Sequence, residues 1–225
     1  MGRRAVIAGA SGLVGQSLLR LLLESPEVDA VASLGRRKLG IASPKLGEWV
    51  LDFKGPAALA DALAEARGDD VFCCLGTTIK KAGSQAAFQE VDHDAPLALA
   101  RAALGAGAQQ FLICTAVGAD AHSRVFYSRV KGELEEALHG LAFPRGIKIV
   151  HPSMILGHRQ ERRPLESMLG LPMKWSSPIF KGPLWRYRPI AAERVARALF
   201  NAALREPPGD RCYEGKPLFR LAGFA

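Results

Sequence analysis

The stretch GASGLVG, residues 9–15, decides the fold prediction for this chain. It directly follows Arg4–Ala8, a short apolar run that is typical of a buried strand. It also opens Leu13–Glu24, where apolar residues recur at the spacing of an amphipathic helix. A glycine triplet alone is weak evidence, but a triplet between a strand and a helix predicts a loop that binds a pyrophosphate.

Each glycine of this loop has a separate predicted task. Gly9 would make the tight turn, Gly12 would let the backbone approach the phosphates, and Gly15 would let the helix pack close to the strand. Amide groups at the start of the helix would then face the anion. A glycine-rich turn without a ligand is the alternative. The predicted cofactor contacts of the loop are Gly9, Ser11, Gly12, Leu13, Val14 and Gly15.

The rest of the chain repeats the alternation of strand and helix. Further strands are predicted at Ala30–Leu34, Trp49–Leu51, Val71–Leu75, Phe111–Thr115 and Ile147–Val150. Helices are predicted at Pro56–Arg67, at Asp94–Gly105 with Asp94 or Asp92 as N-cap, at Arg124–Leu141 and at Ala191–Arg205. Apolar strands separated by helices indicate an α/β fold with a doubly wound parallel sheet, the Rossmann fold.

We expect residues 1–225 to form one domain. The cofactor part would cover about residues 1–150, and a small irregular C-terminal lobe within residues 153–225 would bind or cover the substrate. The proline-rich segment 170–189 is the candidate lid.

Composition narrows the functional classes. The net charge of +8 suits a phosphorylated ligand, but the basic residues are scattered and only 7% of residues are aromatic, so we expect no specific nucleic-acid binding. No uninterrupted apolar run is long enough to predict a membrane span. The histidines lack ligand-like spacing, so no metal site is predicted. The four cysteines favour reduced, buried thiols and a cytoplasmic location.

The end of the second strand indicates which dinucleotide would bind. SLGRRKL, residues 33–39, has no acidic residue to hold ribose hydroxyls and instead carries Arg36 and Arg37. A guanidinium can hold a 2′-phosphate with two parallel hydrogen bonds, whereas a carboxylate would repel it. This pattern favours NADP(H), with a solvated basic loop as the alternative.

Four longer stretches carry a family resemblance. They are FCCLGTTIKKAGS (72–84), VDHDAPLALARAALGAGAQQFL (91–112), VGADAHSRVFYSRVKGE (117–133) and HPSMILGHRQERRP (151–164). Together with the glycine loop they resemble the atypical and extended short-chain dehydrogenase/reductases, in the group of the Tat-interactive oxidoreductase-like proteins and their bacterial counterparts. The resemblance covers essentially the whole chain and implies a Rossmann fold that binds NADP(H).

The resemblance also implies catalytic roles. In the superfamily a tyrosine exchanges a proton with a carbonyl or alcohol, and a lysine four residues later lowers its pKa; here these are Tyr127 and Lys131. The i, i+4 spacing puts both on one helix face. Thr115 would orient the carbonyl, or it simply ends a strand. Ala116 and Asp92 depart from the usual serine and asparagine, which puts the completeness of the site in doubt.

The same resemblance extends to the remaining cofactor contacts. Asp52 resembles an acid that contacts adenine, although a turn cap is the alternative, and the segment after the sixth strand would lie near the nicotinamide. The predicted contacts are Asp52 and Phe53, then Leu75, Gly76 and Thr77, then Pro152 and Ser153, with Tyr127 and Lys131. HRQERR, residues 158–163, either faces the substrate or is a solvated helix start.

Two functions remain open at this level. The first is an NADP(H)-dependent oxidoreductase acting on a small carbonyl or alcohol, as a monomer or homodimer. The second is a non-catalytic NADP(H)-binding regulator or assembly factor that reports redox state to a protein partner.

Overall fold

A seven-stranded parallel sheet forms the centre of the computed structural model, which describes residues 2–157 and 182–224. The strand order is β3-β2-β1-β4-β5-β6-β9. The strands are β1 (Arg3–Ala8), β2 (Val28–Gly35), β3 (Leu46–Val50), β4 (Asp70–Cys73), β5 (Gln110–Cys114), β6 (Ile147–His151) and β9 (Arg211–Glu214).

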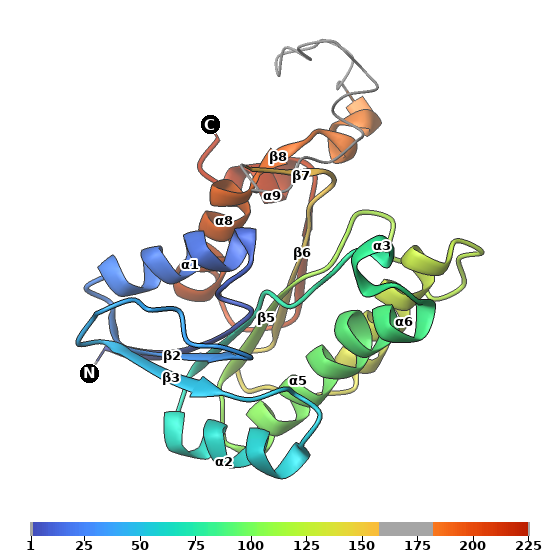
Figure 1. Cartoon of the computed structure of the whole chain (residues 1–225). Helices are drawn as coiled ribbons and strands as arrows, with labels where there is room; N and C mark the ends of the chain where they lie inside the picture. Colours follow the sequence, from blue (N-terminus) through green and yellow to red (C-terminus); the bar gives the residue numbers. More distant parts are fainter. Residues whose placement is uncertain (1, 158–181, 225) are drawn as a thin grey trace.

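Helices cover both faces of this sheet (Figure 1). One layer holds α1 (Leu13–Glu24), α8 (Ala192–Arg205) and α9 (Lys216–Leu221); the other holds α2 (Pro56–Ala66), α5 (Ala95–Gly105) and α6 (Phe126–His139). Because both faces are covered, central strands such as β4 and β6 are buried at every residue. Two hydrophobic cores result, one on each side of the sheet.

The order of the strands locates a ligand crevice. From β1 the chain proceeds outward to β2 and β3, and then returns to build β4, β5 and β6 on the other side of β1. In such open sheets ligands bind at this reversal, outside the carboxyl ends of the strands. The loops that follow β1, β4 and β5 therefore meet at one edge, and they contain most of the predicted site residues.

The doubly wound fold predicted from the sequence is confirmed, but the predicted start of one helix is wrong. Neither Asp92 nor Asp94 is an N-cap, because α4 (Gln85–Gln89), the π-helical turn η1 (Glu90–Asp94) and α5 follow one another without a break. The cap is Ser84, whose hydroxyl accepts the N–H of Ala87 at 3.1 Å. Pro96 has no N–H to donate, and the wider turn places it inside a continuous helix.

The C-terminal region contains more regular structure than was expected. The helix predicted at its centre is α8, and β9 and α9 were not foreseen. Two short strands, β7 (Ile155–Leu156) and β8 (Ile190–Ala191), pair beside the 3-10 helix η2 (Gly182–Tyr187). HRQERR and residues 170–181 of the candidate lid lie outside the described residues.

The four cysteines are free thiols, but they are not all buried. Cys73 is buried, Cys74 and Cys114 are half-buried, and Cys212 is exposed on β9. In the parts of the chain that the structure describes, no helix is long and apolar enough to cross a membrane.

Candidate functional site

The glycine loop has the geometry of a phosphate cradle. Gly9 adopts a φ of +84°, which only glycine reaches without strain, and its carbonyl accepts the N–H of Gly12 at 2.9 Å. A Cβ on Gly15 would lie 2.2 Å from the Gly9 carbonyl oxygen, so no other residue fits there. Gly12 caps α1 without a side-chain hydrogen bond, which leaves first-turn amides, such as those of Leu13 and Val14, directed at a ligand position.

Ser11, at the tip of the loop, is exposed and extends the same edge. A Cβ on Gly9 would lie 2.5 Å from the carbonyl oxygen of Cys74, so the glycine loop packs directly on the chain that leaves β4. The loops after β1 and β4 are therefore in backbone contact, as a shared dinucleotide site requires.

The basic residues after β2 are placed to meet a charged ligand. Arg36 and Arg37 are both exposed, and neither forms an ion pair within residues 2–157 and 182–224. Two exposed guanidinium groups with no counter-ion among the described residues could hold a phosphate.

Asp52, in the segment after β3, forms the turn cap that was the alternative to a contact with adenine. Its Oδ1 accepts the N–H of Lys54 at 3.0 Å, and the side chain is exposed. The next residue, Phe53, is buried with a φ of 65°, an unusual conformation for a bulky side chain. Such strained backbone is concentrated at functional sites, and the Phe53 side chain belongs to one of the two hydrophobic cores.

The loop after β4 is fixed by a residue that lies elsewhere in the sequence. The N–H of Thr77 donates to Oδ2 of Asp92 at 2.7 Å. Gly76 lies above this carboxylate, and a Cβ there would be 3.5 Å from Oδ1. Leu75 packs against the hydrophobic core below. Asp92 thus sets the path of the backbone that would pass the cofactor ribose.

Lys131 is buried and paired on α6. Its side chain is 4% exposed, and Nζ lies 2.7 Å from Oδ1 of Asp92, which is 2% exposed. Burial alone would lower the pKa of Lys131, but the charge of Asp92 and the nearby Tyr127 outweigh it and raise that pKa above its ordinary value. The ammonium therefore stays charged at neutral pH.

Tyr127 lies one helical turn before Lys131 on the same helix. It is half-buried, and its ring packs against the ring of Phe88, with centroids 5.6 Å apart. Phe88 is completely buried in α4 and also contacts Phe126, so it forms a rigid floor under the tyrosine. The sequence analysis did not single out Phe88, whose only signal was one aromatic residue in a helical segment.

Thr115 directly follows β5 and is 5% exposed. Its N–H donates to the carbonyl of Val150 at 3.1 Å, but its buried hydroxyl has no hydrogen-bond partner among the described residues. Buried polar groups are normally paired, so an unpaired hydroxyl in this position fits a ligand oxygen. Ala116, beside it, is buried at 7% exposure and supplies no such group.

Gly132 is a further residue that the sequence analysis missed. A Cβ there would lie 2.1 Å from the backbone nitrogen of Ala121, which belongs to the loop between β5 and α6. This close approach holds α6, and with it Lys131, against the loop that carries Thr115 and Ala116. An isolated glycine inside a predicted helix was the available signal.

The segment after β6 is anchored to the C-terminal part of the chain. Pro152 accepts the N–H of Val117 at 3.1 Å, and the Ser153 hydroxyl donates to the carbonyl of Arg188 at 2.6 Å. His151 lies between Glu135 at 2.9 Å and Glu214 at 3.4 Å. These bonds fix the backbone near the predicted nicotinamide position, but they occupy the Ser153 hydroxyl.

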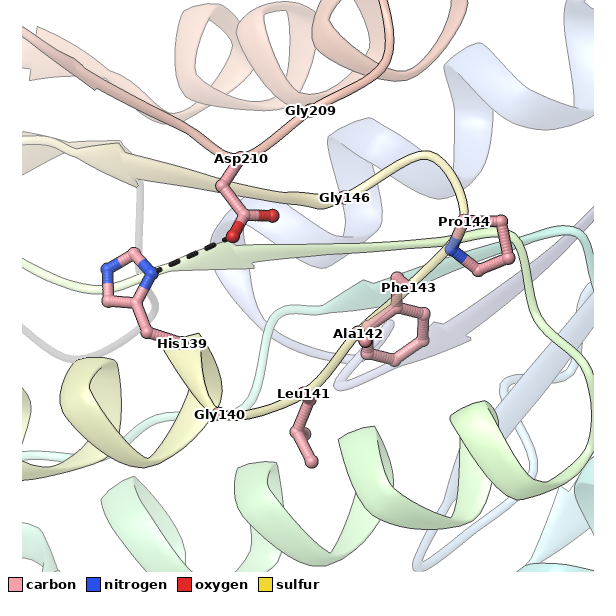
Figure 2. A pocket seen from close by; sticks show the side chains of 9 residues that line it. All are labelled: His139, Gly140, Leu141, Ala142, Phe143, Pro144, Gly146, Gly209 and Asp210. Carbon is pink, nitrogen blue, oxygen red and sulfur yellow. Dashed lines mark ion pairs between the residues drawn. The ribbon is translucent and has the colours of Figure 1, made fainter.

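A shallow pocket of about 350 Å³ lies elsewhere (Figure 2). It is lined by the turn from His139 to Pro144 together with Gly146, Gly209 and Asp210, which precede β6 and β9. It therefore lies at the amino-terminal edge of the sheet, opposite the glycine loop. No group of three or more His, Cys, Asp or Glu side chains among the described residues could hold a metal ion.

This fold and site define a class. A glycine loop between β1 and α1, and a tyrosine and lysine on the helix after β5, are the features of an NAD(P)-binding Rossmann protein of the short-chain dehydrogenase/reductase type. The chain belongs to the NAD dependent epimerase/dehydratase family, which matches residues 5–128.

Curated relatives and solved structures agree with this assignment. Protein HTATIP2 of Rattus norvegicus is 38% identical over 180 residues, covering 76% of this chain and 72% of its own. Protein FMP52, mitochondrial, of Meyerozyma guilliermondii is 32% identical, covering 89% and 85%. Its Aspergillus fumigatus counterpart is 33% identical, covering 96% and 94%. The resemblance inferred from the sequence is confirmed.

Two structures share the fold at lower identity. An oxidoreductase of the short chain dehydrogenase/reductase family from Burkholderia thailandensis has a TM-score of 0.73 at 22% identity, covering 97% of this chain and 94% of its own. A short chain dehydrogenase from Burkholderia cenocepacia, solved with NADP, has a TM-score of 0.67 at 21% identity, covering 98% and 91%.

The relatives correct one expectation from the sequence. The predicted cytoplasmic location is wrong when judged against the fungal FMP52 proteins, whose names describe them as mitochondrial. Reduced thiols and the lack of a candidate membrane span do not separate these compartments, and they were the only basis for that expectation.

Proposed function

We propose that this protein is an NADP(H)-dependent oxidoreductase that acts on a small carbonyl or alcohol compound. One observation carries the proposal: a lysine ammonium buried to 4% exposure follows Tyr127 by one helical turn, at the edge of the sheet that bears the glycine loop. Burying a charged group costs free energy of desolvation. Buried groups with perturbed pKa values are concentrated at functional sites.

The chemistry follows from three side chains. When bound, the reduced dinucleotide supplies the hydride that reaches the carbonyl carbon, and the Tyr127 hydroxyl gives its proton to the carbonyl oxygen. Thr115 donates a hydrogen bond to the same oxygen and fixes its position. Its buried hydroxyl, which has no hydrogen-bond partner within residues 2–157 and 182–224, supports this role. Lys131 holds the cofactor ribose and stabilises the negative charge left on Tyr127.

Burial decides whether Lys131 can act on Tyr127. A unit charge about 4 Å away contributes about 1 kcal/mol in water but about 4 kcal/mol at an effective dielectric constant near 20. The low exposure of Lys131 supports the larger value for a single charge at this position, because the effective dielectric constant is low there. General acid catalysis by a positioned side chain contributes about 10²–10⁴-fold to a rate.

Replacing Tyr127 by Phe tests the catalytic half of the proposal. NADPH consumption would be followed with a panel of aldehydes, ketones and quinones. We expect turnover by the wild type and a loss of at least about 100-fold in kcat for Y127F, with nucleotide binding retained. Absence of turnover in the wild type, or equal turnover in the variant, would refute the catalytic role.

Nucleotide titrations test the cofactor half. Arg36 and Arg37, exposed and with no counter-ion in the described part of the chain, would hold the 2′-phosphate together with the first-turn amides of α1. The double variant R36A/R37A should lose at least about tenfold in NADP affinity and little in NAD affinity. Lys45, which donates to two backbone carbonyls below the sheet edge, offers a control site for the removal of a basic charge. Equal wild-type affinity for NAD and NADP would remove the role of the arginines.

A non-catalytic NADP(H)-binding regulator is the second candidate. The observations that favour it are Ala116 in place of a hydroxyl residue and the direct pairing of Asp92 with Lys131. It predicts nucleotide binding that Y127F leaves unchanged together with no turnover, so the two experiments above separate the candidates.

A further inference from the structure

Asp92 changes the charge that Tyr127 faces. In the Asp92–Lys131 pair the two opposite charges lie 2.7 Å apart, and both side chains are at most 4% exposed. The Asp92 carboxylate accepts hydrogen bonds on both oxygens, from Lys131 and from the N–H of Thr77, so it is fixed in place against the ammonium. Lys131 therefore acts on its surroundings as one half of a neutral pair rather than as a lone cation.

The other groups around Lys131 do not restore a net charge. Among the described residues, those that face it are Asp92 from η1, Tyr127 from its own helix, Cys114 from β5 and Cys73 from β4. Burial raises the pKa of Cys73 and that of Cys114 to about 12, so both thiols are neutral near pH 7. Asp92 is the nearby anion that offsets Lys131.

Resting on the proposed function, we propose that Asp92 is a positioning residue that offsets the effect of Lys131 on Tyr127. Tyr127 then keeps its proton at neutral pH. A protonated Tyr127 favours carbonyl reduction over alcohol oxidation. In reduction the phenol must start protonated, since its proton passes to the carbonyl oxygen while the hydride from the dinucleotide adds to the carbon. Oxidation of an alcohol needs the phenolate instead.

Two further contacts of Asp92 support this role. The carboxylate joins the loop after β4, through Thr77, to the catalytic helix, through Lys131. The residue lies in the π-helical turn, a distortion that is frequent at functional sites. One side chain thus sets both the position of Lys131 and the charge balance beside Tyr127.

Tyrosinate absorbance tests the proposal without any substrate. The chain has three tyrosines. Tyr213 is bonded to Glu206, and burial and this carboxylate raise its pKa further above the ordinary value, while Tyr187 is 49% exposed. Subtracting the titration of Y127F from that of the wild type isolates Tyr127. We expect no tyrosinate from Tyr127 in the wild type at pH 8.

The variant D92N should move this titration. Removing one nearby anion at low exposure should make tyrosinate from Tyr127 appear at least about one pH unit lower, a tenfold change in proton affinity, relative to D92N/Y127F. D70N is the matched control, because Asp70 is also a buried carboxylate paired with a cation, Arg3, but it begins β4 at the opposite edge of the sheet. D70N should leave the Tyr127 titration unchanged.

The outcomes separate this inference from the proposed function. Tyrosinate from Tyr127 in the wild type at pH 8 would overturn the role of Asp92 even if D92N fails to fold, and so would a D92N titration that matches the wild type. The predicted shift without any turnover would leave the role of Asp92 intact and refute the enzymatic proposal. With turnover, D92N should also raise the ratio of alcohol oxidation to carbonyl reduction at pH 7 at least about tenfold.

Discussion

The buried hydroxyl of Thr115 has no hydrogen-bond partner in the part of the chain that the structure describes, and this has an energetic consequence. Its Oγ1 is buried beside the sheet edge, while the backbone N–H of the same residue is bonded to Val150. A buried polar group left unpaired costs about 1–3 kcal/mol. Active sites often contain groups that lower stability and contribute to function, and an unpaired hydroxyl at the edge where a cofactor would bind is such a group.

The variant T115V should therefore be more stable and less active. Valine has nearly the shape of threonine, so it removes the unpaired hydroxyl without leaving a cavity. We expect the free energy of unfolding in urea to rise by about 1 kcal/mol. Turnover of a carbonyl substrate should fall at least about tenfold, because the substrate oxygen loses a hydrogen bond that strengthens in the transition state.

T115S is the control for this variant, since it keeps the hydroxyl and loses only a methyl group. It should retain most of the activity. A T115V protein that is less stable than the wild type would mean that the hydroxyl has a stabilising partner, and it would contradict the interpretation of Thr115 as a group reserved for a ligand.

The sequence predicted the local backbone features of the glycine loop, but not the contacts between distant side chains. The tasks of Gly9 and Gly15 were predictable because a tight turn and a close helix approach depend on local chain geometry. The ion pair of Asp92 and Lys131 was not predictable, because it joins residues from separate elements. From the sequence, Asp92 was expected to act as a possible helix N-cap. In the structure its carboxylate instead binds Lys131 and the N–H of Thr77.

At the scale of elements, the position of α6 depends on a single close contact. Gly132 lets the helix approach the backbone of Asp120 and Ala121 in the preceding loop, where a Cβ would overlap at 2.1–2.2 Å. The clash would be with backbone atoms, which cannot rotate away as a flexible side chain can. The adjacent residue is Lys131, so any outward movement of α6 also moves the predicted catalytic pair.

The variant G132A should displace α6 and lower both stability and activity. Overpacking of this kind costs roughly 1–3 kcal/mol, and it outweighs the gain of about 1 kcal/mol in helix propensity. We expect a lower urea midpoint and at least about a tenfold loss in kcat/KM. G105A is the matched control, because Gly105 ends α5 with no atom within 4 Å of its would-be Cβ. Equal effects of the two variants would show that the contact at Gly132 is unimportant.

The elements themselves were predictable to different degrees. Apolar runs such as those of β1 and β6 were recognised within one or two residues, because a strand buried on both faces is mostly apolar. β9, with the sequence RCYE, was missed because an edge strand of four residues with two charges has no such pattern. Only its pairing with β6 makes it a strand.

At the scale of the whole molecule, the C-terminal third of the described chain is part of the same sheet and layers as the first two thirds. α8 packs against α1 in one core, and β9 completes the sheet beside β6. One domain over residues 1–225 stays a prediction. His151 reinforces the connection, since it lies between Glu135 of α6 and Glu214 of β9.

His151 should make the stability of the molecule depend on pH. Burial alone would lower its pKa, but the contacts with Cys212 and Glu135 outweigh burial and raise that pKa from 6.5 to about 10. The folded protein therefore binds this proton more tightly than the unfolded chain does. The resulting stabilisation is complete below pH 6.5 and is lost as the pH rises through about 10.

Urea unfolding at pH 6 and pH 9 measures this loss. We expect the wild type to lose about 3 kcal/mol more than H151N over this interval, since each unit of pKa shift is worth about 1.4 kcal/mol. E135Q should show an intermediate dependence, because it removes one of the two carboxylates. H139N is the matched control, since His139 is 55% exposed and lies 4.0 Å from Asp210, and its pH dependence should equal that of the wild type. If H151N and the wild type lose the same stability, the imidazolium does not hold β9 and α6 together, and the connection rests on apolar packing alone.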